Sequence, residues 1–203
     1  MNRMLRKISV LAISLFASGP LLADDLAIEN CAWCHGNSGQ GYSKAPRLAG
    51  QRVPYLVNQL HAFSTHKRDE TLGVKYMWNA TANLDPSTAS RLAAYFSALP
   101  PDAAKDGESE LVAEGKAIFE NGAPDENVVA CQACHGPAAQ GVREIPRLGG
   151  LSYYYVKRRL NDWRQGLDES GTPMPKVGAS LSPRQIDAIA SYISFVESQS
   201  SER

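Results

Sequence analysis

Apolar residues recur at helical spacing in two separate stretches of the chain. Between residues 53 and 63 they step by three, four and three positions, which places them on one face of an amphipathic helix, and residues 156–163 repeat the pattern. No stretch alternates convincingly between apolar and polar positions as a half-buried strand would. The pattern predicts an all-α protein. The apolar positions are Val53, Leu56, Leu60 and Phe63 in the first stretch and Val156, Leu160 and Trp163 in the second.

Capping signals predict a second pair of helices. Asp85 and Ser182 each precede a proline, and a capping side chain before proline is typical of a helix start. Gln185 can complete a capping box in the second of these helices. An apolar stripe follows there at Ile186, Ile189, Ile193 and Val196. Each helix is therefore expected to bury one face.

The N-terminus has the features of an export signal. A basic start is followed by the apolar run Ile8–Ala17, a Gly-Pro break and Leu21-Leu22-Ala23, which resembles a cleavage site. The alternative is a retained membrane anchor, but a span needs about 20 apolar residues and this run is shorter. Residues 1–23 are therefore predicted to be a signal peptide that directs the protein to the periplasm, an oxidising compartment.

Charge does not indicate a nucleic-acid partner. The 203-residue chain has 21 basic and 21 acidic residues. Removal of residues 1–23 takes away three basic residues and leaves a net charge of −3. Such a balance lacks the basic excess typical of nucleic-acid binding, so we expect protein partners.

The most informative feature is a five-residue motif that occurs twice. Cys31-Ala32-Trp33-Cys34-His35 recurs one hundred residues later as Cys131-Gln132-Ala133-Cys134-His135, and 12 of the 30 positions in 31–60 and 131–160 are identical. Self-similarity at a fixed period indicates duplication. The polar, proline-containing segment 100–107 is predicted to link two domains at residues 24–99 and 108–199.

The repeated motif predicts two covalently attached haem c groups. In C-x-x-C-H, two thiols add to the two vinyl groups of one porphyrin and the adjacent histidine binds the iron. The predicted residues are Cys31, Cys34 and His35 in the first domain and Cys131, Cys134 and His135 in the second. With fewer than 100 residues, each helical domain is expected to complete its core with the porphyrin.

Other readings of the four cysteines explain less. A thioredoxin-type pair usually lies in a βαβ pattern, which is not seen here. Two zinc ions would need more ligands than four cysteines provide. Two disulfides would leave the repeated histidine unexplained.

Methionine is the predicted second axial ligand of each iron. Outside the signal peptide the chain has two methionines, Met77 and Met174, at matching positions of the two copies. A lone methionine is more often a flexible core residue, but the duplication argues for ligation. At the first haem, His61 and His66 are alternative ligands, although neither has a counterpart in the second copy.

The two copies differ at their beginnings. Residues 111–119 of the second copy have the apolar positions of a helix before the haem motif, whereas only residues 24–30 precede the motif in the first. The leading helix of the first copy is expected to be truncated, and its haem to be the more exposed.

On these residues the chain resembles the dihaem cytochrome c4 family. The resemblance covers nearly all of the mature chain and implies two class I cytochrome c domains related by pseudo-twofold symmetry, each with His/Met iron. It also implies that the Pro46 and Pro146 carbonyls accept the proximal histidine N–H, and that Arg47 and Arg147 lie near the haem propionates, although a role as surface charge stays open. The matching segments are 31–36, 46–51, 55–56, 59–60, 82–84 and 94–96, and 131–136, 146–150 and 190–193.

The leading functional hypothesis is a periplasmic electron carrier without a catalytic residue. By resemblance, its partners are a terminal oxidase or a dehydrogenase, and association with the membrane surface stays open. One alternative is a dedicated dihaem subunit of a periplasmic dehydrogenase, because the short start is similar to that of flavocytochrome subunits. The other is a dihaem enzyme, such as a peroxidase, which would need an open or displaceable sixth position at one iron.

Overall fold

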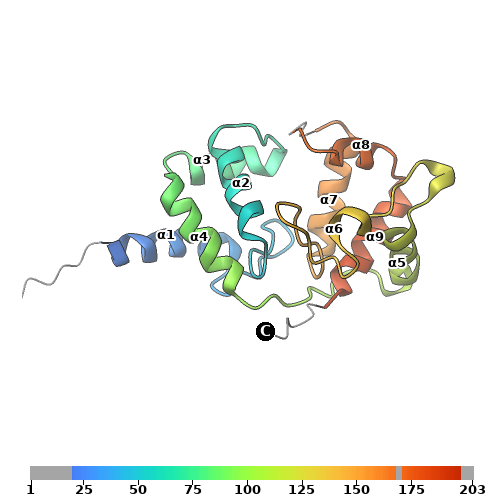
Figure 1. The fold of residues 1–203 in the computed structure, drawn as a ribbon, viewed down its shortest axis with the longest axis horizontal. Coiled ribbons are helices and arrows are strands. Elements are labelled where there is room, and N and C mark those ends of the chain that lie inside the picture. The colour runs from blue at the N-terminus through green and yellow to red at the C-terminus, as the bar shows by residue number, and fades with distance from the viewer. Residues whose placement is uncertain (1–19, 168–170, 198–203) are drawn as a thin grey trace, which may run out of the picture.

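Two groups of helices lie side by side, with the segment between α4 and η2 connecting them (Figure 1). This computed structural model describes residues 20–167 and 171–197, with side chains from residue 25 onward. The described residues contain no β-strand, only two isolated bridges, which confirms the all-α prediction. The first group consists of α1 (Pro20–His35), α2 (Val53–Ser64), the π-helix η1 (Gly73–Met77), α3 (Trp78–Thr81) and α4 (Pro86–Ala98). The second consists of η2 (Ser109–Leu111), α5 (Val112–Asn121), η3 (Pro124–Glu126), α6 (Gln132–His135), α7 (Tyr153–Arg164), α8 (Met174–Ala179) and α9 (Pro183–Phe195).

The helices that the hydrophobic pattern predicts are present in both groups. Leu56 and Phe63 of α2 are buried, whereas Val53 is 36% exposed, so the first position of the predicted apolar face does not join the core. In α9 the three isoleucines of the stripe are buried, and Val196 lies just after the helix as its C-cap. Leu60, in the middle of the predicted face of α2, is half-buried, so the 3.6-residue period identified the buried side of each helix but not the burial of every position.

Most of the predicted signal peptide lies outside the described residues, which begin at Pro20. Within the described ranges, no helix is both long enough and apolar enough to cross a membrane.

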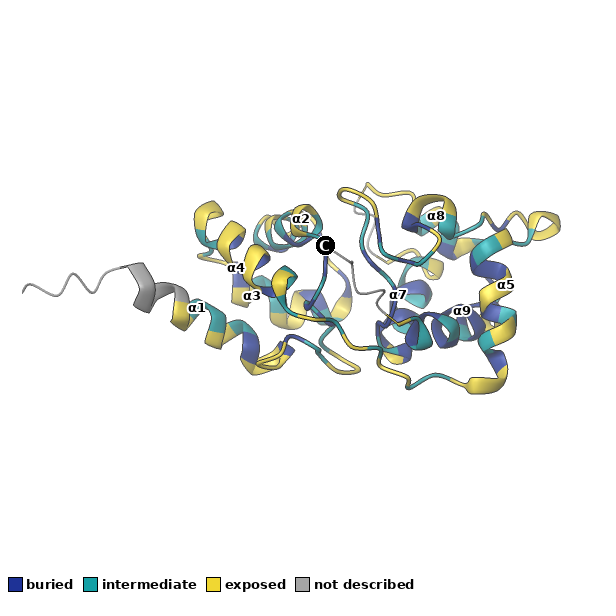
Figure 2. Ribbon diagram, turned by 60° about the horizontal axis from the view of Figure 1, so that its bottom comes forward, coloured by how far each residue is buried: buried dark blue, intermediate teal, exposed yellow. Residues whose placement is uncertain are grey.

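The second group has the larger apolar core. Dark blue in Figure 2 marks its buried residues, which are dense along α9. Helix α5 crosses α9 at Gly115, where any side chain would overlap the Ala188 carbonyl and Tyr192. In the first group, α1 contacts a smaller cluster around Leu92 and Phe96 through Ala27, Ile28 and Cys31. Helix α1 itself has 16 residues and runs through the motif, against 10 in α5, so the expected truncation of the first leading helix stays a prediction that depends on cleavage after Ala23.

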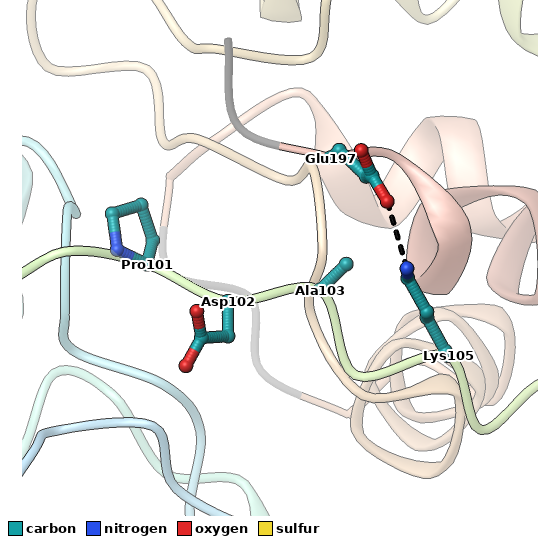
Figure 3. Close-up of a pocket in the computed structure, with 5 residues that line it drawn as sticks. All are labelled: Pro101, Asp102, Ala103, Lys105 and Glu197. Carbon is teal, nitrogen blue, oxygen red and sulfur yellow. Dashed lines mark hydrogen bonds and ion pairs between the residues drawn. The ribbon is translucent and has the colours of Figure 1, made fainter. Parts of the chain in front are cut away.

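The connecting segment is held to the helices by its backbone. Asp102 N donates to Gln40 Oε1 (3.0 Å), and Lys105 N donates to the Ser194 carbonyl (2.9 Å). Nearby, Lys105 and Glu197 form an exposed ion pair of 2.7 Å across a shallow pocket (Figure 3). Fixed at both ends, the segment restricts how the two groups of helices can move relative to each other.

Buried polar groups join the two groups of helices directly. The Gln51 side chain donates to the Arg147 carbonyl (2.9 Å) and accepts from the Arg147 amide (2.8 Å). The Arg47 guanidinium donates to the carbonyls of Asp102 and Gly149. Because buried amide and guanidinium groups require such partners, these bonds favour one relative orientation of the two groups.

A buried ion cluster lies at the same junction. Arg68 donates to both oxygens of Glu70, with distances of 3.0 and 2.6 Å, and to Gln59 at 2.6 Å. Arg159, from the second group, places a guanidinium nitrogen 3.7 Å from Glu70 Oε1. The side chains of Arg68, Glu70 and Arg159 are 8%, 4% and 6% exposed. Glu70 therefore interacts with two arginines from different halves of the chain, and Arg159 also lies 3.6 Å from Asp162 Oδ2.

The helix caps predict different acid sensitivities for the two copies. Hydrogen bonds from the Thr88 hydroxyl and amide and from the Ser87 amide lower the pKa of the Asp85 carboxyl at the start of α4. A carboxyl whose pKa is lower in the folded state stabilises the fold at neutral pH, and this stabilisation is lost as pH falls through the folded-state pKa. The equivalent cap of α9 is Ser182, which does not titrate in this range.

We expect Asp85→Asn to be tolerated at neutral pH, because asparagine caps helices about as well as aspartate. Denaturant unfolding from pH 6 down to pH 2 should then show wild type losing stability relative to the variant as the carboxyl is protonated. Ser182→Asn serves as the control, with a difference from wild type that does not change over this range. A constant Asp85→Asn difference would contradict the assignment.

Candidate haem sites

Each repeated motif lies at the end of a helix, with its cysteine and histidine side chains on one side. Cys31, Cys34 and His35 lie in the last turns of α1, three and four residues apart, so their side chains share a face. In the second copy, Cys131 is the N-cap of α6 and the helix ends at His135. In both copies two thiols and one imidazole therefore come from adjacent positions of one short stretch.

Both proximal imidazoles are fixed by the same hydrogen bond. His35 Nδ1 lies 2.8 Å from the Pro46 carbonyl, and His135 Nδ1 lies 2.9 Å from the Pro146 carbonyl. A carbonyl only accepts, so Nδ1 carries the proton and Nε2 keeps the lone pair that can bind a metal. Burial lowers the pKa of both rings, which keeps them neutral. This geometry agrees with what the family resemblance implied.

Glycines shape the loop that brings each proline to its histidine. The amides of Gly41 and Gly141 each donate to the carbonyl of the motif histidine at 2.8 Å. Both residues have positive φ, and any side chain at either would overlap the backbone of the following proline segment. The repeated Gln-Gly dipeptide is thus the element that folds the loop back over the motif.

The four cysteines all lie within the described ranges, and none of them forms a disulfide there. Burial raises the pKa of Cys31, and it raises the pKa of Cys131 to about 11. Cys34 and Cys134 are exposed. Each pair therefore has one sheltered and one accessible sulfur, both available for a thioether bond.

Two buried donors in the second copy fit a haem. In the part of the chain that the structure describes, Arg147 Nε and Trp163 Nε1 are buried without a hydrogen-bond acceptor. A haem has two propionates that accept such bonds, and buried donors rarely remain without a partner. Arg47 and Arg147 are 6% and 9% exposed, so the alternative of a surface charge is wrong for both.

The two candidate axial methionines are placed differently. Met174 is the first residue of α8 and packs against the same apolar cluster as Cys131. Met77 ends the π-helix η1, is half-buried, and its carbonyl accepts from Thr81 Oγ1 at 2.8 Å. The structure thus brings Met174 and its haem motif to one core.

The alternative ligands at the first haem lie at the surface. His61 and His66 are both exposed, and the His66 ring stacks on Trp78 with a centroid distance of 4.0 Å. This stacking accounts for His66 without an iron.

Sequence reasoning missed the buried ion cluster of Arg68, Glu70 and Arg159. Arg68 and Glu70 lie in the charged run 66–70, which has the composition of a solvated loop. One indirect signal was a tyrosine that recurs in the two copies, as Tyr55 and Tyr155, and the structure places these residues beside the cluster. Burial raises the pKa of Tyr55 to about 12, and Tyr155, Arg68, Arg159 and Glu70 all lie close enough to influence it.

Comparisons with known proteins agree with this geometry. The cytochrome c family model matches residues 21–100 and 112–197. A cytochrome c4 from Pseudomonas aeruginosa is 34% identical over 87% of this chain and 89% of its own length. A thiosulfate dehydrogenase electron acceptor from Stutzerimonas stutzeri is 35% identical over 82% of this chain and 78% of its own. The solved structure of Acidithiobacillus ferrooxidans cytochrome c4 aligns with a TM-score of 0.77 and 36% identity, covering 82% of this chain and 98% of that one.

Two matched domains, each with a complete attachment motif, mean that the protein carries two covalently bound haem c groups and transfers electrons. The similarity extends over most of both chains, and the fold is shared. The chain therefore belongs to the dihaem cytochrome c4 family.

Proposed function

We propose that this protein is a freely diffusing periplasmic carrier that takes single electrons from a dehydrogenase and delivers them to a terminal oxidase. In this proposal His35 and Met77 bind the first iron, and His135 and Met174 bind the second. Residues 1–23 are removed on export, and residues 100–107 link domains at 24–99 and 108–199. When bound, each haem supplies an iron that alternates between the ferric and ferrous states.

The observation that carries the proposal is the locked proximal histidine in both copies. The hydrogen bonds from His35 to Pro46 and from His135 to Pro146 fix each ring and increase its basicity. The thioether of methionine favours ferrous iron and raises the potential. No side chain is required to move a proton, which distinguishes a carrier from an enzyme.

Buried hydrogen bonds between the halves support exchange of electrons between the two haems. The bonds of Gln51, Arg47 and Arg147 hold the two haem sites at a constant distance and orientation.

A dehydrogenase is supported as the electron donor by one relative, which is named as an electron acceptor of thiosulfate dehydrogenase. A dedicated subunit would have the same haem chemistry but a permanent partner, and co-purification of a flavin or quinoprotein chain would identify it.

An optical redox titration of the natively matured protein tests the proposal. The expected result is two low-spin haems at positive potential, with the Met-to-ferric charge-transfer band and no reaction with carbon monoxide. A high-spin haem, or one that binds carbon monoxide readily, would contradict paired methionine ligation and would favour a dihaem enzyme.

A further inference from the structure

The outer face of α1 presents two large apolar side chains to solvent. Leu26 is 61% exposed and Trp33 is 91% exposed. They are seven residues apart, which is two helical turns, and therefore lie on the same side of the helix. The opposite side, with Ala27, Ile28 and Cys31, packs against the first core. Figure 2 shows α1 extending from the rest of the molecule with exposed bands along it.

Trp33 is close to the first haem by covalent connection. Its neighbour Cys34 is exposed and is one of the two attachment cysteines. On the helix, Trp33 projects to the side opposite His35 and Cys31, so a haem held by those two residues would leave the indole accessible. A protein that contacts Trp33 is therefore one residue from a thioether bond of the porphyrin.

In the described part of the second copy, the haem motif does not lie on an equivalent long helix. Ala133 occupies the position of Trp33, and α6 is a single turn that begins only at Gln132. The Gln132 side chain donates to the Glu120 carbonyl, which ties this turn to α5. The apolar face is thus specific to the first haem, and the duplication does not account for it.

The charged side chains that α1 itself contributes to this face are acidic. Asp25 and Glu29 are exposed on α1, and Glu29 lies between Leu26 and Trp33 on the same side. No lysine or arginine occurs in residues 24–43. An apolar centre with an acidic border complements an apolar centre with a basic border, and such complementarity steers encounter.

We propose that Leu26, Glu29 and Trp33 form a docking surface for a redox protein whose own contact face is apolar and bordered by lysine or arginine. Exposed aromatic side chains are frequent anchors in protein interfaces, and clustered exposed apolar residues mark such sites. The surface makes the first haem the point at which this partner exchanges electrons. This inference rests on the proposed carrier function and adds the chemistry of the partner.

The test measures electron transfer from the reduced, natively matured protein to two oxidants by stopped flow. One oxidant is a lysine-rich single-haem ferricytochrome c, which has a basic border, and the other is ferricyanide, a small anion that needs no apolar contact. We expect Trp33→Ala to lower the second-order rate constant with the cytochrome about threefold or more, and Leu26→Ala to lower it less. Higher ionic strength should lower the wild-type rate constant.

Val129→Ala is the matched control, because Val129 is 59% exposed but lies in the second copy. It should leave both rate constants unchanged. Ferricyanide should oxidise all variants at the wild-type rate, and the redox titration of Trp33→Ala should match that of wild type. Equal slowing with both oxidants, or no slowing with either, would overturn the docking surface.

A lipid surface is the competing occupant. In sedimentation with vesicles of zwitterionic and anionic phospholipid, we expect the wild-type protein not to bind. Binding of wild type that is lost in Trp33→Ala would overturn the proposal. Failure of the carrier function would be seen separately. Carbon monoxide would then bind a haem in the wild-type protein and in Trp33→Ala alike.

Discussion

Replacing Met174 by alanine is expected to convert the second haem from low-spin to high-spin, with loss of its part of the Met-to-ferric charge-transfer band. The variant should bind carbon monoxide, because a coordination position opens. Its potential should fall by roughly 0.1–0.2 V, a modest part of the roughly 0.8 V that axial ligands span. Visible spectra and a redox titration of Met174→Ala and Met77→Ala measure both effects.

The two methionines should differ in how easily an added ligand displaces them from the iron. Met174 begins α8 between Pro173 and Pro175 and packs on the second core, so its approach is fixed. Met77 ends a π-helix and is not part of the first core cluster. Met77 should therefore be displaced more easily by an added ligand such as imidazole in the wild-type protein.

Val177→Ala is the control, because Val177 lies on α8 and is also half-buried. It should keep the charge-transfer band and the carbon monoxide resistance of wild type. If Met77→Ala left the first haem low-spin with an unchanged potential, another side chain would be the ligand, and His61 and His66 would be the first candidates.

The sequence predicted those features that repeat or that follow from local chemistry. The haem motifs recur with their flanks, and the caps at Asp85 and Ser182 form within a few residues. The apolar face of α9 follows from its period alone, because burial on one side of a helix needs no knowledge of the partner.

Features that depend on pairing between the halves could not be predicted. Glu70 was one acid in a charged run, and only the fold brings Arg159 to it. The single-copy residue Trp33 has no matching residue in the repeat, so duplication could not identify it. One sequence read by itself indicates which residues can be buried, but not which residues distant in the chain they contact.

The two halves differ in their cores and in their exposed surfaces. The second copy has the larger core and the methionine set between prolines, whereas the first has the exposed helix next to its haem. If electrons enter through the first haem, the buried junction around Gln51 and Arg147 must hold the second haem in place for the next step. The stability of that junction is therefore relevant to function.

Glu70→Gln is expected to destabilise the protein by about 3 kcal/mol, because it removes the buried carboxylate that pairs with Arg68 and lies 3.7 Å from Arg159. Arg68 would keep hydrogen bonds to a neutral side chain, but Arg159 would lose its 3.7 Å ion pair across the junction. Denaturant unfolding of the natively matured protein, followed by tryptophan fluorescence, measures the change. Because the cluster joins the halves, the variant should also lose cooperativity and unfold over a broader range.

Glu197→Gln is the matched control, since Glu197 pairs with Lys105 but its side chain is 72% exposed. Exposed pairs contribute about 0–1 kcal/mol, so this variant should unfold close to wild type. Equal effects of the two substitutions would show that water reaches Glu70 and that the cluster does not hold the halves together. A large loss confined to Glu70→Gln, with both haem spectra intact, would instead assign the cluster to the junction rather than to either haem.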